Sequence, residues 1–374
     1  MQDSNRNLHI VAFDVPFPAN YGGVIDIFYR IKALHALGVR ITLHCYKYGR
    51  EESLELNKYC ETVHYYNRKT FKNPIYSKLP YIVNSRNSVE LLENLKINVS
   101  PILFEGLHCC YYLAHPDLKN RFKIVRTHNI EHDYYANLEK VENNFFKKYF
   151  FRVESERLRK FESRLKHANL VAAISPSDYK YFSKKFPKVM YLPAFHPNEE
   201  MRSVNGKGDF VFYHGNLGVG ENDEAAKYLV KNVAPNLKYP LIIAGANPSN
   251  ELRKLIEANK SISLLENLNS QEMLEYVKNA QVNVLPTFQN TGIKLKLINS
   301  LFLGRHCVAN KLMTQNTGLE NLCHMANNPL QFQKQINSLM KQPFGLDQIE
   351  KRKQQLLQQF DNKTNAAKLL AQII

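Results

Sequence analysis

"PTFQNTGIKLKLINSLFLGRHCVAN" (residues 286–310) is the stretch that decides the fold prediction. It begins as the end of a strand, continues as an apolar helix, and returns to a strand-like segment after Gly304. The polar and small residues around the helix start are Thr291, Gly292, Lys294, Lys296 and Asn299. A helix start offers unpaired amides and a positive dipole end, glycine allows close approach, and lysine adds a full charge. The stretch therefore predicts a phosphate-binding turn; the alternative is a core helix whose lysines are solvated.

Length and composition set the broad class. The chain has 374 residues and is 44% hydrophobic, enough for two domains with cores of their own. It contains no apolar run of about 18 residues and starts with a polar segment, so we expect neither a membrane span nor a signal peptide. Six scattered cysteines without metal-like spacing are expected to be reduced thiols, which favours the cytoplasm. A net charge of +16 favours phosphate-bearing partners: nucleic acid, an anionic membrane or a nucleotide.

Short apolar runs alternate with helical patterns along both halves of the chain. Such runs are typical of parallel strands that are buried on both faces. The break "SVNGKGD" (203–209) marks the predicted domain boundary. We predict an α/β protein with two doubly wound, Rossmann-like domains that face a cleft. The domains span residues 1–200 and 201–349, with a C-terminal helix (about 350–374) that packs back on the first domain.

Two further loops follow predicted strands. "PFPANYGGVID" contains Gly22 and Gly23, which open a helix, and "HGNLGVGEN" contains Gly215 and Asn216. Ligands of doubly wound folds bind beyond the carboxyl ends of the strands, so both loops are candidate ligand contacts. Neither loop has the GxGxxG spacing of a dinucleotide site.

Three segments in this order resemble one family. "PFPANYGGVIDIFYRIKALHALG", "RTHNIEHDYY" and "GIKLKLINSLFLGRHCVAN" are similar to segments of GT-B glycosyltransferases, most closely the retaining enzymes of family 4. The resemblance implies transfer of a sugar from a nucleotide-sugar bound mainly by the C-terminal domain. The acceptor would be a glycan or a lipid-linked glycan on the N-terminal domain, in surface polysaccharide or glycan assembly. It also implies that no metal or other cofactor is needed, because amides and lysines would stabilise the leaving pyrophosphate.

The resemblance also implies roles for single residues. His128 would lie near the donor sugar as the catalytic residue; the alternative is a strand-end histidine that bonds only to backbone. The donor contacts would be Gly215, Asn216, Thr291, Gly292, Lys294, Lys296 and Asn299. The candidate acceptor contacts are Glu105, Asn129 and Glu131, with a core position as the alternative for Glu105. The family often has two glutamates where this chain has Thr291 and Asn299, and an arginine and a lysine where it has Asn216 and Glu221.

Two basic segments predict a membrane partner. Residues 66–87 are basic, aromatic and poorly periodic, which predicts a long surface loop, and residues 142–168 form a basic amphipathic helical pattern. Both suit an anionic membrane, so we expect peripheral binding at the inner face of the cell membrane. Two other classes stay open: a non-catalytic GT-B relative and a nucleic-acid-binding protein. The chain has no recognised nucleic-acid-reading motif, so we expect no nucleic acid partner.

Overall fold

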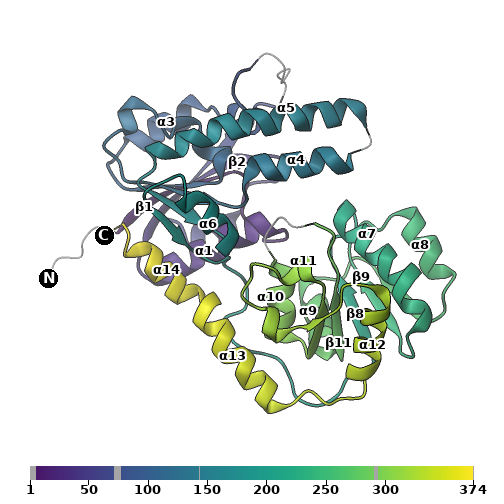
Figure 1. Cartoon of the computed structure of the whole chain (residues 1–374). Helices are drawn as coiled ribbons and strands as arrows, with labels where there is room; N and C mark the ends of the chain where they lie inside the picture. Colours follow the sequence, from purple (N-terminus) through teal and green to yellow (C-terminus); the bar gives the residue numbers. More distant parts are fainter. Residues whose placement is uncertain (1–5, 71–76, 143, 290–293, 374) are drawn as a thin grey trace. The chain divides into compact units, whose positions relative to one another are not determined.

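The computed structural model describes residues 6–70, 77–142, 144–289 and 294–373, which form two α/β units (Figure 1). The first unit comprises the described residues through Pro197 and those from Phe360 onward. The second comprises the described residues between Asn198 and Gln359.

A seven-stranded sheet forms the centre of the first unit, and every paired neighbour in it is parallel. The strand order is β3-β2-β1-β4-β5-β6-β7. The strands are β1 (Asn7–Ala12), β2 (Arg40–Lys47), β3 (Thr62–Asn67), β4 (Ile102–Glu105), β5 (Lys123–Thr127), β6 (Leu170–Ala173) and β7 (Val189–Tyr191). The order reverses between β1 and β4, and the carboxyl ends of these two strands are where a doubly wound sheet binds ligands.

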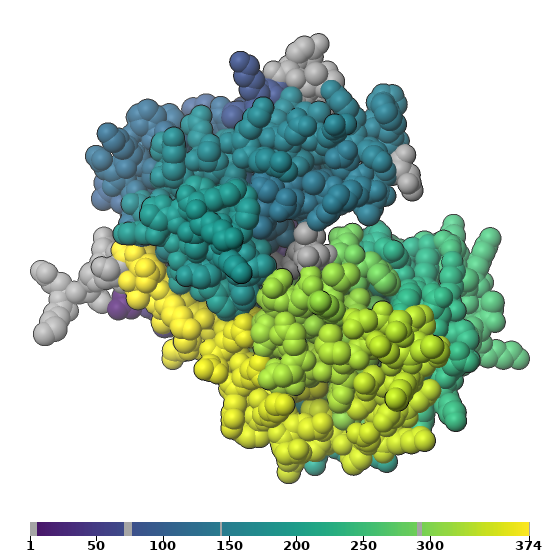
Figure 2. Space-filling view, in the orientation of Figure 1, coloured from purple at the N-terminus to yellow at the C-terminus, as the bar shows by residue number. Residues whose placement is uncertain are grey.

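Helices cover both faces of this sheet. They are α1 (Gly22–Ala36), α2 (Tyr81–Asn84), α3 (Val89–Lys96), α4 (Glu131–Val141), α5 (Phe145–Phe161), α6 (Pro176–Ser183) and α14 (Asn362–Leu370). Ser175 caps α6 by accepting from the amide of Asp178 (3.1 Å), with Pro176 as its first residue. Helix α14 packs against α1 and places Ala366 and Leu369 in the core, and the C-terminal segment is yellow in Figure 2.

The second unit repeats this architecture with a six-stranded parallel sheet in the order β10-β9-β8-β11-β12-β13. Its strands are β8 (Val211–His214), β9 (Leu241–Ala244), β10 (Ile262–Leu265), β11 (Val282–Leu285), β12 (His306–Ala309) and β13 (His324–Met325). Its helices are α7 (Gly220–Tyr228), α8 (Asn250–Glu257), α9 (Ser270–Asn279), α10 (Leu295–Leu303), α11 (Lys311–Thr314), α12 (Pro329–Leu339) and α13 (Leu346–Phe360). Here the order reverses between β8 and β11, which places the candidate ligand edge at the ends of these strands.

The predicted class, two doubly wound parallel-sheet domains, is confirmed, and the cleft between them stays a prediction. The basic pattern of residues 142–168 begins after α4 and consists mainly of α5. Within residues 66–87, the expected surface loop is wrong in part: α2 forms there, and Ile82, Val83 and Arg86 are buried. None of the helices in the described part of the chain is long and apolar enough to cross a membrane.

Candidate active site

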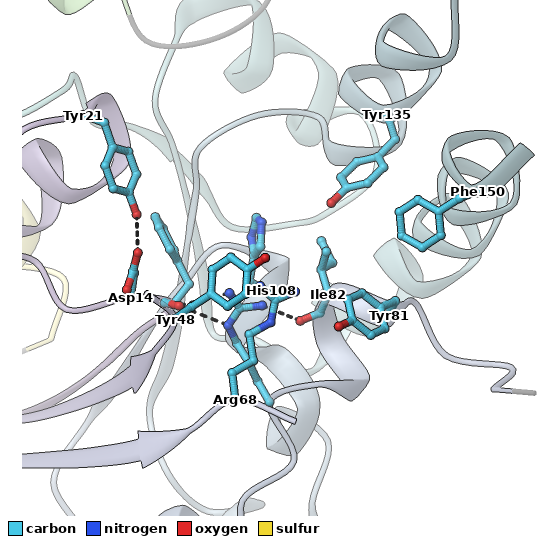
Figure 3. Close-up of a pocket in the computed structure, with 11 residues that line it drawn as sticks. Asp14, Tyr21, Tyr48, Arg68, Tyr81, Ile82, His108, Tyr135 and Phe150 are labelled. Atoms are coloured by element: carbon cyan, nitrogen blue, oxygen red, sulfur yellow. Dashed lines mark hydrogen bonds between the residues drawn. The ribbon is translucent and has the colours of Figure 1, made fainter. Parts of the chain in front are cut away.

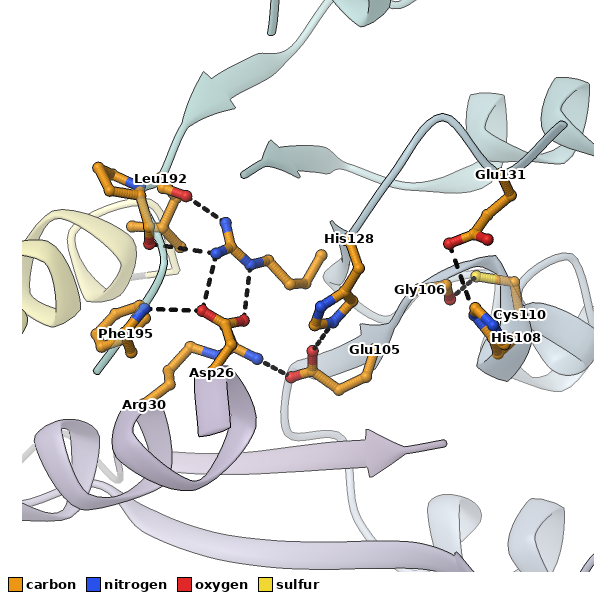
Figure 4. A network of polar contacts seen from close by, with 12 residues as sticks. Asp26, Arg30, Glu105, Gly106, His108, Cys110, His128, Glu131, Leu192 and Phe195 are labelled. Carbon is orange, nitrogen blue, oxygen red and sulfur yellow. Dashed lines mark hydrogen bonds and ion pairs between the residues drawn. The ribbon is translucent and has the colours of Figure 1, made fainter. Parts of the chain in front are cut away.

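A buried charge network joins β4, β5 and α1 of the first unit (Figure 4). Asp26 of α1 accepts from Arg30 Nη1 (2.7 Å) and from Arg126 Nη2 (3.0 Å). Arg30 also donates to Oε1 of Glu105, at the end of β4. Burial opposes ionisation of Asp26, but the guanidinium groups of Arg126 and Arg30 outweigh it and hold the pKa of Asp26 below its ordinary value. The two carboxylates and two arginines therefore balance each other in charge.

His128 lies at the edge of this network, directly after β5. Its Nε2 is 3.0 Å from Oε2 of Glu105, so we infer that Nε2 carries the proton donated to the carboxylate. Its Nδ1 is buried and has no partner among the described residues. The ring also meets the ring of Phe13 edge-on at 5.3 Å. Glu105 thus binds Nε2 of His128 and leaves Nδ1 as a hydrogen-bond acceptor.

Ligand-type atoms of Asp26, Glu105 and His128 lie within 4.8 Å of one another. Both carboxylates already bind guanidinium groups, so the trio fits an ion network better than a cation site. Glu105 is fully buried and bonds through both oxygens, so it can act on a substrate only by orienting His128.

Glu131 and Asn129 follow β5 at the start of α4. Burial, with a smaller contribution from Asp178, raises the pKa of Glu131 to about 8, while the charge of Arg86 and a hydrogen bond with the Asn129 side chain oppose this shift. Oε1 of Glu131 is buried without a hydrogen-bond partner and lies 3.9 Å from Nδ1 of His108. Burial, helped by the charge of Arg86, lowers the pKa of His108 well below its ordinary value. Both side chains are therefore neutral near pH 7, with unused hydrogen-bonding atoms.

A cavity of about 330 Å³ opens beside these residues within the first unit (Figure 3). Its walls carry the aromatic rings of Tyr21, Tyr48, Tyr81, Tyr135 and Phe150. The predicted glycine loop shapes one side of it. Gly23 opens α1 together with Gly22, and a Cβ at Gly23 would lie 2.6 Å from the ring of Phe13. Glycine at this position therefore lets Phe13 lie between the loop and His128.

In the second unit, Lys296 lies in the first turn of α10 and reaches the end of β8. Its Nζ donates to Oδ1 of Asn222 (2.8 Å) and lies 4.7 Å from the ring centroid of Tyr213. Burial lowers the pKa of Lys296 to about 8, with Glu221 opposing and Lys294 adding to the shift. A Cβ at Gly215 would lie 2.9 Å from this Nζ, so the glycine allows the lysine to approach the strand end.

Helix α10 begins at Leu295, directly after Lys294. Thr291 and Gly292 lie outside the described residues. Lys294 takes the N-cap position and donates through Nζ to the carbonyl of Gln289 (3.3 Å). The structure therefore brings Lys294 and Lys296 together at the helix start, where backbone amides are unpaired.

Two asparagines of the predicted donor site are already engaged. Oδ1 of Asn299 accepts from Nδ2 of Asn198 (2.7 Å). Asn216 is exposed, its carbonyl accepts from Asn222 (2.9 Å), and its side chain accepts from the amide of Gly218 (3.1 Å). The Asn216 side chain thus holds its own loop, and the Asn299 amide group remains as a donor.

Sequence reasoning missed several residues of both sites. Asn222, Tyr213 and Glu221 surround Lys296, and Glu221 also accepts from the hydroxyl of Thr287. Asn222 is the last residue of the loop "HGNLGVGEN" and lies in the first turn of α7, a position that could have marked it as a site residue. Arg68 and Arg86 of the cavity lie in the basic, aromatic segment 66–87, but that pattern predicted a membrane-facing loop rather than the wall of a cavity.

Taken together, the two parallel-sheet units have the fold of the GT-B glycosyltransferases. Among solved structures, TarM is similar over 99% of both chains with a TM-score of 0.70 and 10% identity. The match to WaaG, a glycosyltransferase involved in lipopolysaccharide biosynthesis, covers 98% of this chain and 99% of the WaaG chain (TM-score 0.65, 11% identity). The match to a UDP-glucose:anthocyanidin 3-O-glucosyltransferase in complex with UDP covers 100% of this chain and 99% of that chain (TM-score 0.59, 12% identity). At such identities the likeness shows the fold alone.

One curated protein is similar in sequence. An uncharacterized 44.6 kDa protein in the cps region of Klebsiella pneumoniae is 27% identical over 368 residues, or 91% of this chain and 92% of that protein. No family model matches the sequence.

Proposed function

We propose that this protein is a glycosyltransferase that moves a sugar, of the hexose type, from a nucleotide-sugar donor to a glycan or lipid-linked acceptor. The observation that carries the proposal is the lysine pair at the start of α10 in a unit of GT-B fold. Solved structures of this fold include glucosyltransferases in complex with UDP. The relative in a cps region supports a role in polysaccharide assembly.

The second unit would bind the nucleotide diphosphate. Lys296 is half-buried and makes no ion pair with a described carboxylate, so a pyrophosphate would supply the counter-charge. Lys294, the unpaired amides of α10 and the loop after β8 would add contacts. This donor set is cationic and hydrogen-bonding, which suits stabilisation of a leaving diphosphate without a metal ion.

The first unit would bind the acceptor and supply His128. Nδ1 of His128 can accept a hydrogen bond from a hydroxyl of the reacting sugar, while Glu105 balances charge that develops on the imidazole. A neutral Glu131 can donate a hydrogen bond, since its pKa of about 8 keeps it protonated at pH 7. Retention of anomeric configuration remains part of the proposal on the strength of the sequence resemblance.

We also propose peripheral binding at the cytoplasmic face of the membrane. The last residue of α4, Val141, is exposed, and the first turns of α5 expose Phe145, Phe146 and Tyr149. Lys147, Lys148 and Arg152 are exposed on the same segment. Aromatic side chains beside lysines and arginines suit the interface of an anionic bilayer.

A thermal-shift screen tests the donor class. UDP, GDP, CMP, ADP and their sugars are added to the full chain, and a ligand of the native state raises the melting temperature. The stabilising nucleotide-sugar is then incubated with the protein, with and without EDTA, and release of nucleoside diphosphate is followed by chromatography. We expect stabilisation and EDTA-resistant turnover. If no nucleotide shifts the melting temperature, the proposal is wrong.

A non-catalytic nucleotide-sugar-binding protein is the second candidate. It is favoured by Asn299, which offers an amide in place of the family's carboxylate and already accepts from Asn198. Donor binding without release of nucleoside diphosphate, tested with acceptor glycans present, would support this candidate over the enzyme.

A further inference from the structure

Arg86 is a buried cation that has no carboxylate partner among the described residues. Its side chain is 4% exposed, and it donates only to backbone carbonyls: to Phe13 from Nε (3.2 Å) and Nη2 (3.0 Å), and to Ile82 from Nη1 (2.6 Å). These bonds occupy three of the five N–H groups of a guanidinium. Burial, helped by the charge of Arg68, lowers its pKa to about 10. A buried charge in this position is destabilising unless a counter-charge joins it.

Arg68 supplies a second guanidinium to the same cavity (Figure 3). It donates from Nε to the hydroxyl of Ser85 (2.9 Å), and its Cζ lies 4.3 Å from the ring centroid of Tyr48 and 5.4 Å from that of Tyr81. No described residue accepts from its Nη atoms. Two guanidinium groups that line one cavity would both gain from one shared anion.

The acidic residues around the cavity do not neutralise this pair. Asp14 is the carboxylate among the lining residues, and it accepts from the amide of Val15 (2.9 Å) and the hydroxyl of Tyr21 (2.8 Å). Burial raises the pKa of Asp14 as well. Glu131, near His108 on the cavity wall, has a pKa of about 8 and is neutral at pH 7. The cavity is therefore positive overall at neutral pH.

The remaining wall is aromatic, and aromatic faces pack against the C–H faces of sugar rings. The ring centroid of Phe13 lies 5.3 Å from those of both His108 and His128, so the cavity adjoins the histidine that we place at the reaction. Its volume of about 330 Å³ is at the small end of ligand pockets and suits one substituted monosaccharide.

We propose that this cavity binds an anionic sugar, a monosaccharide unit that bears a phosphate or a carboxylate, with Arg68 and Arg86 sharing the anionic group. Its role as the acceptor end rests on the proposed function, whereas the preference for an anionic sugar does not. Phosphate and carboxylate share the bidentate chemistry that guanidinium recognises.

Calorimetric titration of the full chain tests the proposal with glucose 6-phosphate, glucuronate, glucose and inorganic phosphate as probes. We expect at least one charged sugar to bind at least tenfold more tightly than glucose, and the tighter of the two identifies the anionic group. Arg68→Gln should weaken this binding at least tenfold, because it removes one of the two guanidinium groups that share the anion. The Arg68 side chain is half-exposed, so we expect this variant to fold. Arg159→Gln, an exposed arginine of α5, should leave it unchanged.

Equal affinity for glucose and the charged sugars would overturn the proposal, and so would unchanged affinity for the charged sugar in Arg68→Gln. The proposal would also be wrong if none of the four probes binds measurably at millimolar concentration. Arg86→Gln is a second variant; if it does not fold, Arg68→Gln still decides. UDP titration is the separate readout for the donor site. Loss of UDP binding with retained charged-sugar binding would refute the transferase proposal and leave the anionic-sugar site standing.

Discussion

His128 donates through Nε2 to Oε2 of Glu105 over 3.0 Å, and its Nδ1 is left buried without a partner. The carboxylate therefore selects which nitrogen of the imidazole is left as a hydrogen-bond acceptor. Glu105 is itself fixed by Arg30, so the orientation of His128 depends on a network anchored in α1.

If His128 supports the transition state, His128→Ala should lower kcat by about 10²-fold or more and leave the donor Kd nearly unchanged. Glu105→Gln should lower kcat less, because an amide still accepts from Nε2 but no longer balances a charge. Steady-state kinetics and nucleotide calorimetry measure both effects. His167→Ala, an exposed histidine of the same unit, is the control. Near-normal turnover in His128→Ala would return this residue to a structural role.

Lys296→Ala should weaken nucleotide binding by about 1–3 kcal/mol, the range for a hydrogen bond to a charged group. Affinity in the wild type should also depend on pH, because the free lysine has a pKa of about 8 and a bound phosphate favours its charged form. Binding is then strongest below pH 8 and weakens as pH rises through 8. Calorimetry between pH 7 and 9 measures both, with exposed Lys311→Ala as control. Unchanged affinity in both Lys294→Ala and Lys296→Ala would contradict the phosphate site.

Asn299 should contact the ribose of the donor. Asn299→Ala is then expected to weaken nucleotide binding by about 0.5–1.5 kcal/mol. Asn299→Glu should be tolerated or bind more tightly, because a carboxylate can accept from ribose hydroxyls and from Asn198 together. The nucleotide Kd of each variant, measured by calorimetry, tests this contact. The Kd of Asn198→Ala shows whether the 2.7 Å hydrogen bond from Asn198 is needed to orient Asn299. Flat values in both Asn299 variants would mean that the donor does not use this residue.

Glu131 should make the stability of the protein depend on pH. Its folded pKa of about 8 lies above the ordinary glutamate pKa of 4.5, so its contribution to stability is complete below pH 4.5 and is lost as pH rises through 8. The loss is at most about 1.4 kcal/mol per pH unit across that window. Denaturant unfolding at pH 6 and 9 should show a smaller difference in Glu131→Gln than in the wild type. Glu156→Gln, exposed on α5, should behave as the wild type.

The exposed aromatic residues at the start of α5 should bind anionic liposomes. Phe145 and Phe146 are 76% and 81% exposed, so the double change to serine removes apolar contact without disturbing the core. Co-sedimentation should require anionic lipid, weaken with salt and fall in this variant. Leu346→Ser, at a residue 69% exposed in the second unit, is the matched control. Equal sedimentation with neutral liposomes would argue against the membrane proposal.

The strands and the parallel-sheet class were predictable because parallel strands buried on both faces are apolar along their whole length. The charge network could not be predicted, because Asp26 and Arg30 lie one helical turn apart in the sequence and resemble a solvated helix face. Both are fully buried, since α1 packs between the sheet and α14. The partner of Asp26, Arg126, is 100 residues away. Local periodicity carries no information on such contacts.

Helix α14 has a consequence for how the protein is made. The first unit contains the amino-terminal residues of the chain, yet its core is completed by Ala366 and Leu369 near the other end. A nascent chain emerges in order, so residues 362–370 must be synthesised before α1 can pack against this covering helix. Until then the apolar flank of α1 stays exposed, while most of the second unit is already synthesised and can fold. Synthesis of α14, rather than emergence of the first sheet, is therefore the event that completes the core of the amino-terminal unit.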